Sequence, residues 1–206
     1  LCEMTQIGLN VPPGFVITTA ACLAYLEKAT LPKGLMDEVK SHIARLEQAT
    51  GKKFGNEDNP LLVSVRSGAR VSMPGMMDTV LNLGLNDETV QGIIDKTGNE
   101  RFGWDSYRRF VHMYGDVVLG MKPESKDEED PFETVMAKLK KEKKITKDTE
   151  MDAATLKELT QRYKKLIKER TKHDFPTDPK EQLWGAINAV FGSWMGERAI
   201  IYRKKE

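Results

Sequence analysis

The chain has 206 residues, of which 32 are basic and 31 acidic, giving a formal net charge of +1 at pH 7. A charge so close to balance gives no electrostatic reason to expect a nucleic-acid partner. No apolar run approaches the about 20 residues that a helix needs to cross a bilayer, so a membrane-spanning role is not expected either.

Up to about Asp87, strand-like and helix-like segments alternate along the sequence. Proline or glycine bounds the strand-like runs, and apolar residues at spacings of three and four mark the helices. The chain opens with a helical stretch that ends at Gly8. The further predicted elements are a strand over 11–18, a helix capped by Thr19 and running to Lys28, a helix from Leu35 that stops at Gly51, and strands over 61–65 and 80–83. Residues 1–87 are therefore predicted to form an α+β unit.

From Asn86 onward the pattern is almost entirely helical. The first expected helices are one that opens at Asn86 or Asp87 and ends at Gly98, and one that runs from Phe102 to Gly115. Asp130–Pro131 and Asp178–Pro179 each combine an N-cap side chain with a proline suited to the first helical turn. Between them an apolar stripe follows one side of a charged helix: Leu156, Leu159, Tyr163, Leu166 and Ile167. We predict a helical segment over 88–175 and a helical return segment over 176–206.

The segment PLLVSVRSGARVSMPGMMD, from Pro60 to Asp78, carries the clearest chemical signal. A buried strand would deliver Arg66 into a loop with Gly68 and Gly75, where free backbone N–H groups can form an anion-binding concavity. A guanidinium offers phosphate oxygens a fixed fork of donors at any physiological pH. The alternative is a strand followed by a surface turn with two solvated arginines, Arg66 and Arg70. Three methionines around a Pro-Gly turn are unusual for a solvated loop, so phosphate binding is favoured.

Together with this loop, several other segments resemble the pyruvate phosphate dikinase family, specifically its amino-terminal nucleotide-binding domain, which is an ATP-grasp domain. They are GLNVPPGFVITTAACLAYL near the start, DTVLNLGLND at 78–87, RFGWDSYRRFVHMYGDVV at 101–118, and FPTDPKEQL with AVFGSW between 175 and 194. The resemblance implies an enzyme that converts ATP, inorganic phosphate and pyruvate into AMP, pyrophosphate and phosphoenolpyruvate. It also implies a phosphorylated histidine on a separate domain, with pyruvate bound on a third.

The resemblance implies roles for particular residues. Arg66, Gly75 and Met77 are expected to surround the ATP phosphates, with Arg70 and Asp78 as further candidates. Arg198, in a basic segment near the end of the chain, is expected to dock against the phosphohistidine domain.

Other parts of such an ATP site are expected outside the sequence. A GGKG-type turn, whose lysine reaches the phosphates, should precede it, and the carboxylate that binds the Mg²⁺ of ATP should follow it. No metal ligand and no complete catalytic set is therefore assigned here, and the chain alone is expected to be inactive. The parent protein is expected to be a homodimer in the cytoplasm or, in a eukaryote, in a plastid or another organelle.

Two other functions stay open at the level of sequence. One is a phosphoenolpyruvate synthase-like ATP-binding domain, since that related family uses a similar arginine-bearing strand. The other is a non-catalytic, mostly helical interaction module in which the methionine loop binds a protein. Loss of nucleotide binding on changing Arg66 would argue against the second.

Arg108 and Arg109 are adjacent on one predicted helix, so their side chains point about 100° apart and only one can easily face a ligand. The structural alternative is that one of them pairs with Asp105 or Asp116 while the other is solvated.

The remaining candidates have simpler interpretations. The three histidines have no evident acidic or nucleophilic partner and are expected to be structural or solvated: His42, His112 and His173. The charged tract over 122–130 is expected to be a solvated linker, because opposite charges alternate closely in it.

Overall fold

The computed structural model of the chain describes residues 2–68, 77–123 and 129–204. Contacts between residues separate the chain into two compact units, Leu1–Lys53 and Phe54–Glu206. Helices and a few short strands are both present, so the predicted α+β class is confirmed. The compositional boundaries expected after residues 87 and 175 both fall inside the second unit. The three-part division and the ATP-grasp fold stay predictions. Within the described ranges no helix combines the length and apolar character needed to span a membrane.

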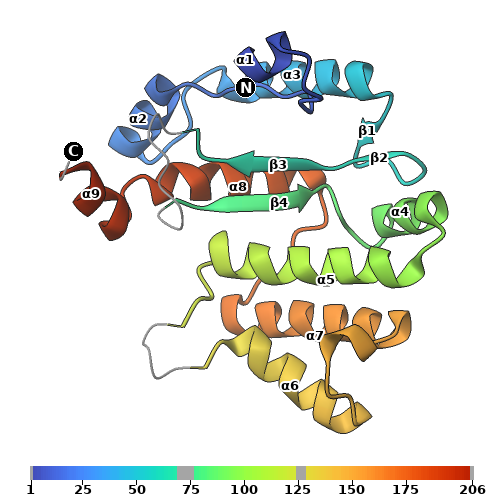
Figure 1. Ribbon diagram of the computed structural model, residues 1–206. Coiled ribbons are helices and arrows are strands. Elements are labelled where there is room, and N and C mark those ends of the chain that lie inside the picture. Colours follow the sequence, from blue (N-terminus) through green and yellow to red (C-terminus); the bar gives the residue numbers. More distant parts are fainter. Residues whose placement is uncertain (1, 69–76, 124–128, 205–206) are drawn as a thin grey trace. The chain divides into compact units, whose positions relative to one another are not determined.

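The first unit is helical, with α1 (Cys2–Gln6), α2 (Thr19–Lys28) and α3 (Leu35–Thr50) (Figure 1). As predicted, α3 stops at Gly51, which adopts a left-handed conformation (φ 66°) while its N–H donates to the carbonyl of Glu47. Glycine takes this conformation without a steric penalty, and such a residue commonly ends a helix. The buried residues of α3 recur at every fourth position: Leu35, Val39 and Ile43.

One prediction in this unit was wrong. Residues 11–18 form no strand, and the N-cap of α2 is Thr18 rather than Thr19, without a capping bond from its side chain. Pro12 and Pro13 have no N–H to donate to a neighbouring strand, so the apolar run stays extended but unpaired among the described residues. Val16, in the middle of that run, is 84% exposed.

Short strands open the second unit. β1 (Lys53–Phe54) lies at the boundary between the units and is followed by β2 (Pro60–Leu61), β3 (Val63–Arg66) and β4 (Thr79–Leu83). β3 and β4 pair antiparallel, with Val65 opposite Val80 and Arg66 opposite Thr79. Val80 and Leu83 of β4 are fully buried. The predicted strands over 61–65 and 80–83 therefore exist, although the first is divided at Leu62.

The rest of the second unit is helical. Its elements are α4 (Thr89–Thr97), α5 (Glu100–Val117), α6 (Pro131–Lys143), the 3₁₀ turn η1 (Asp148–Glu150), α7 (Ala153–Thr171), α8 (Pro179–Ser193) and α9 (Glu197–Arg203). The two predicted Asp-Pro starts are confirmed. Asp130 accepts hydrogen bonds from backbone N–H groups at the start of α6, and Asp178 does so for α8.

Two predicted helix ends were wrong. α4 begins at Thr89, although the side chain of Asn86 accepts the N–H of Thr89 at 2.8 Å just before it. α5 does not end at Gly115 but continues to Val117. A Cβ at Gly115 would lie 2.3 Å from the ring of Phe132. Glycine at this position permits close packing and does not terminate the helix.

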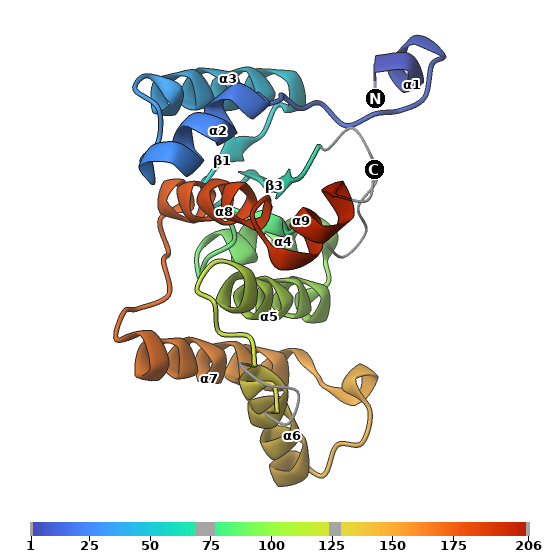
Figure 2. The same cartoon turned by 90° about the vertical axis from the view of Figure 1, so that its left-hand side faces the viewer.

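The elements of the second unit lie in successive layers (Figure 1). α8 packs against β3 and β4, α5 packs against β4, α7 packs against α5, and α6 packs against α7. Figure 2 shows the same order from the side. Fully buried aromatic rings fill the space around α5, α6 and α7: Tyr107, Phe110, Phe132 and Tyr163. These layers support the hairpin that carries the candidate site.

Candidate functional site

The candidate site lies where β3 ends and β4 begins. Arg66 is the last residue of β3 and its side chain is exposed. Among the described residues no carboxylate forms an ion pair with Arg66. The pairing of Val65 with Val80, one residue back along each strand, fixes the backbone from which the guanidinium extends. The strand therefore ends in an exposed, permanently charged side chain, and its contact with a ligand stays a prediction.

The residues that open β4 are anchored to neighbouring segments. The N–H of Asp78 donates to Ser193 Oγ at 3.2 Å, and that hydroxyl donates to the carbonyl of Val190 at 2.7 Å. Met77 is half-buried, with its Sδ 3.0 Å from Ser67 Oγ. The end of α8 thus holds the start of β4 beside the strand that carries Arg66.

Lys122 is a functional candidate that sequence reasoning missed. Its Nζ lies 3.4 Å from Asp78 Oδ1, although the tract 122–130 was expected to be a solvated linker. The preceding residue, Met121, is buried, and its N–H donates to the carbonyl of Gly115 at 3.0 Å. The apolar Met121, directly before the charged tract, was the one signal in the sequence that this backbone is fixed. Of the described residues at the hairpin end, Arg66 and Lys122 are cations and Asp78 is an anion.

Two of the expected site residues lie outside the described residues. These are Arg70 and Gly75. Their proposed contacts with phosphate stay predictions from the sequence.

Arg108 and Arg109 differ in burial but share one partner. Arg108 is buried and its guanidinium lies 2.5 Å from Asp105, whereas Arg109, 66% exposed, reaches the other oxygen of the same carboxylate at 2.8 Å. Burial alone would raise the pKa of Asp105, but hydrogen bonds and charge attraction from the two arginines outweigh it and lower that pKa. Both arginines therefore pair with Asp105, where only one was expected to pair, and Arg109 is the one that also faces solvent.

Arg198 projects from the short helix α9. Its side chain is exposed, next to the buried Ala199. Arg203 of the same helix instead lies over the ring of Trp194, 4.1 Å from its centroid. Arg203 therefore packs within the chain, whereas the docking role of the exposed Arg198 stays a prediction.

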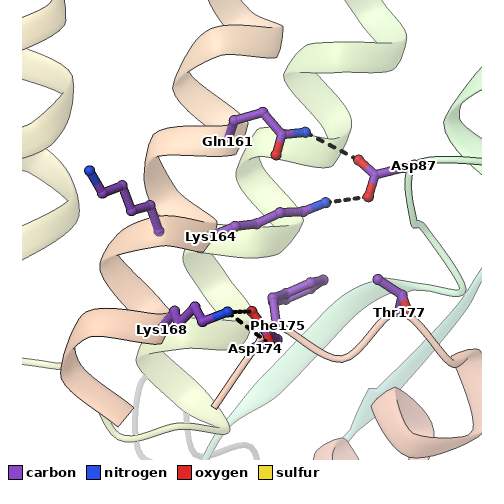
Figure 3. Close-up of a pocket in the computed structure, with 8 residues that line it drawn as sticks. Asp87, Gln161, Lys164, Lys168, Asp174, Phe175 and Thr177 are labelled. Atoms are coloured by element: carbon purple, nitrogen blue, oxygen red, sulfur yellow. Dashed lines mark hydrogen bonds and ion pairs between the residues drawn. The ribbon is translucent and has the colours of Figure 1, made fainter. Parts of the chain in front are cut away.

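A cavity of about 380 Å³ lies between α7 and residues 174–177 (Figure 3). Lysines line it, but Lys164 is 2.5 Å from Asp87 and Lys168 is 2.9 Å from Asp174. Paired charges attract an anion less than the guanidinium of Arg66 does, which has no carboxylate partner among the described residues. None of the expected site residues lines this cavity, and we assign it no role.

The histidines occupy three different environments. His42 stacks on Phe15, with ring centroids 5.0 Å apart, and His173 is exposed in the turn after α7. His112 was expected to lack an acidic partner, yet its Nε2 lies 3.3 Å from Asp116 and 3.6 Å from Asp130. Asp116 lies one helical turn after His112 on α5, and Asp130 is the N-cap residue of α6.

The structure defines an α+β domain with charged side chains at one end of its β3–β4 hairpin. Residues 28–206 match the family described as "Pyruvate phosphate dikinase, AMP/ATP-binding domain". The chain is 53% identical to pyruvate, phosphate dikinase of Rhizobium meliloti, and the match covers 98% of this chain and 22% of the relative. It is 52% identical to pyruvate, phosphate dikinase of Entamoeba histolytica, over 100% of this chain and 23% of the relative. It is 49% identical to the chloroplastic pyruvate, phosphate dikinase 1 of Arabidopsis thaliana, over 98% of this chain and 20% of the relative.

The chain therefore belongs to the pyruvate phosphate dikinase family, which confirms the resemblance drawn from its motifs. It spans about a fifth of the length of the relatives it matches.

Proposed function

We propose that this chain forms part of the ATP site of an enzyme that converts ATP, inorganic phosphate and pyruvate into AMP, pyrophosphate and phosphoenolpyruvate. The observation that carries the proposal is the exposed guanidinium of Arg66 at the end of β3. A charge held on a strand end, without a carboxylate partner among the described residues, is suited to the phosphates of a nucleotide. The names of the relatives favour the dikinase over the phosphoenolpyruvate synthase-like alternative and over an interaction module.

In this proposal Arg66, Gly75 and Met77 contact the phosphates, with Arg70 as a further contact. Asp78 would repel a triphosphate if its charge were free. Lys122, 3.4 Å from Asp78, offsets that charge and adds a second cation to the site. Mg²⁺ bound with ATP would be held mainly by carboxylates outside this chain.

The proposal also includes the partners of this domain. Arg198, exposed on α9, would dock with the domain that carries the phosphorylated histidine. We further propose that the whole protein is a homodimer. Its location would be the cytoplasm or, as for the relatives named chloroplastic, a plastid.

The test is Arg66→Ala in the full-length enzyme. If the guanidinium tightens on the phosphates during transfer, its loss should remove about 2–4 kcal/mol of transition-state stabilisation, or about 30- to 1,000-fold in rate. The readout is phosphorylation of the enzyme's histidine from ATP. Arg45→Ala, at an exposed position of α3, is the matched control and should leave the rate unchanged. Equal rates in the two variants would overturn the assignment of Arg66.

The chain by itself should transfer no phosphoryl group. Phosphoryl transfer needs positioned cations and in-line geometry, and this chain spans only about a fifth of the length of its relatives. The measurement follows AMP and pyrophosphate after mixing the chain with ATP, Mg²⁺ and phosphate. Turnover that disappears in Arg66→Ala would show the site to be complete within these residues.

A further inference from the structure

His112, Asp116 and Asp130 converge at the junction between α5 and the start of α6. His112 and Asp116 lie one turn apart on α5, and Asp130 is the N-cap of α6. One ligand atom from each side chain can be chosen so that all three atoms lie within 4.8 Å of one another. This cluster is separate from the hairpin end and has no place in the proposed reaction.

The surrounding contacts fix the orientation of two of these side chains. Asp130 Oδ1 accepts the N–H groups of Phe132 at 2.7 Å and Glu133 at 3.1 Å, which leaves Oδ2 directed at His112. The imidazole lies against the ring of Phe132, with centroids 4.7 Å apart, and its neighbour Tyr163 meets it edge-on at 5.6 Å. Both aromatic residues are fully buried. Partners of this kind orient ligands in metal sites.

The polar atoms at the centre of the cluster are unsatisfied. His112 Nε2 and Asp116 Oδ1 are buried and accept or donate no hydrogen bond to a described residue. One oxygen of each carboxylate lies within ion-pair distance of Nε2. With a neutral imidazole the cluster would carry two negative charges at mostly buried positions. Such an arrangement requires a cation, either a proton on His112 or a bound ion.

The local field also favours a positive charge. Burial alone would lower the pKa of His112, but Asp116 and Asp130 outweigh it and raise that pKa. The charges on neighbouring elements that bear on Tyr163, directly beside His112, include Arg108 and Glu133, and Arg108 is already paired with Asp105. Among the described residues no lysine or arginine forms an ion pair with Asp116 or Asp130, whose ion-pair contacts are with His112.

We propose that His112, Asp116 and Asp130 bind a divalent transition-metal ion of the zinc class. Zinc takes imidazole and carboxylate ligands at about 2.0–2.2 Å, so that neighbouring ligand atoms of a tetrahedral site lie about 3.3 Å apart. The distances from His112 Nε2 to the two carboxylates are 3.3 and 3.6 Å. The third pair of ligand atoms, one from Asp116 and one from Asp130, lies within 4.8 Å. Mg²⁺ is disfavoured because it prefers oxygen ligands in an octahedron. The ion would join α5 to the start of α6.

The experiment titrates the metal-free chain with Zn²⁺ in competition with a chromophoric chelator. We expect one ion per chain, a higher melting temperature with Zn²⁺, and no rise with Mg²⁺ at the same concentration. His112→Gln keeps the side chain polar and similar in size but removes the ligand nitrogen. Mutation of residues that only support the ligands of a metal site lowers metal affinity about 10- to 100-fold. Loss of a ligand itself should therefore weaken Zn²⁺ binding by more than about 100-fold. His173→Gln, at an exposed histidine, is the matched control and should bind like the unchanged chain.

A second readout uses the unchanged chain and so does not depend on the folding of a variant. Co²⁺ added to the unchanged chain should give the visible absorption of a site with a nitrogen ligand, and Zn²⁺ should displace it. Asp116→Asn, which keeps the shape of the side chain, should weaken binding in the same direction as His112→Gln. Absence of stoichiometric binding would show that a protonated His112 alone neutralises the carboxylates. Binding that survives His112→Gln would place the ion elsewhere. Either result would overturn the proposal.

Discussion

The helices α5, α6 and α7 and the end of the β3–β4 hairpin use their side chains in opposite ways. Between the helices, aromatic rings such as those of Phe132 and Tyr163 are fully buried, and aspartates cap the helix starts. At the hairpin end, Arg66 is an exposed cation, and a single described hydrogen bond joins the backbone of Asp78 to α8. We therefore expect the buried contacts between the helices to supply more of the stability than the exposed charge at the hairpin end, which we propose to act on a ligand.

The comparison predicts that the largest loss of stability follows from a change between the helices. Phe132 is fully buried, with its ring against Gly115 and 5.0 Å from the ring of Tyr163. Phe132→Ala would leave a cavity that the surrounding helices cannot fill. The free energy of unfolding should fall by about 3–5 kcal/mol, measured by urea unfolding followed by circular dichroism.

Phe102→Ala is the matched control, because Phe102 also belongs to this region but is 50% exposed on α5. Its effect should stay within about 0.5 kcal/mol, as for most surface substitutions. Similar losses in the two variants would mean that the helices do not depend on this aromatic core.

Gln182 tests the link between the helices and the hairpin. It is fully buried on α8, where its Oε1 accepts the N–H of Gly84 and its Nε2 donates to the carbonyls of Leu85 and Pro176, each at 2.9 Å. Gln182→Leu keeps the volume but leaves buried backbone groups without partners. The expected loss of unfolding free energy is about 1–3 kcal/mol.

Gln161→Leu is the matched control for Gln182→Leu. Gln161 is exposed and donates one hydrogen bond to Asp87 at 3.3 Å. A change within about 0.5 kcal/mol is expected at this site. If Gln182→Leu were equally mild, the hairpin would not be held to α8 through Gln182.

How well each region could be predicted from the sequence depends on how far apart in the sequence its contacting residues lie. The stripe of Leu156, Leu159 and Tyr163 is a local pattern, since residues three and four apart share a helix face, and all three residues are buried. The strand that ends at Arg66 was also visible as an apolar run bounded by proline. The partners of Asp78 were not, because Lys122 is 44 residues away in sequence and Ser193 is 115 residues away.

Local patterns also failed where packing decided the outcome. Glycine often ends a helix, so Gly115 was predicted to end α5. It instead leaves room for the ring of Phe132, and no spacing rule reveals that contact. Asp116 stands four residues after His112 and could have been noticed as a partner. Asp130 could not, because only the position of α6 brings it to the imidazole.

A smaller effect is expected from acid acting on Asp105. The pKa of this carboxyl is lower in the folded chain than its ordinary value of about 3.9 in an unfolded one. Its contribution to stability is therefore complete above that value, and it is lost as the pH falls through about 4 toward the folded pKa. Because Arg109 is largely exposed, the pH-dependent part should be about 1 kcal/mol or less.

The measurement compares urea unfolding at pH 6 with unfolding below pH 4. Asp105→Asn should lose less unfolding free energy over this interval than the unchanged chain, because its side chain has no proton to gain. Arg109→Ala keeps the buried contact with Arg108 and should retain most of the acid sensitivity. Identical pH profiles for the unchanged chain and Asp105→Asn would show that other groups cause the acid sensitivity.

The smallest effect on stability is expected at Arg66, the residue at which the hairpin end differs most from the buried helices. Its side chain is exposed at the end of β3 and has no carboxylate partner among the described residues, so Arg66→Ala removes no ion pair that the described residues form. The free energy of unfolding should change by less than about 0.5 kcal/mol. The same substitution should slow phosphorylation of the histidine in the full-length enzyme, because the guanidinium is proposed to act on the ligand. A stability loss well above that bound would show that Arg66 supports the fold. Slow phosphorylation in the variant would then reflect a disturbed hairpin instead of a missing phosphate contact.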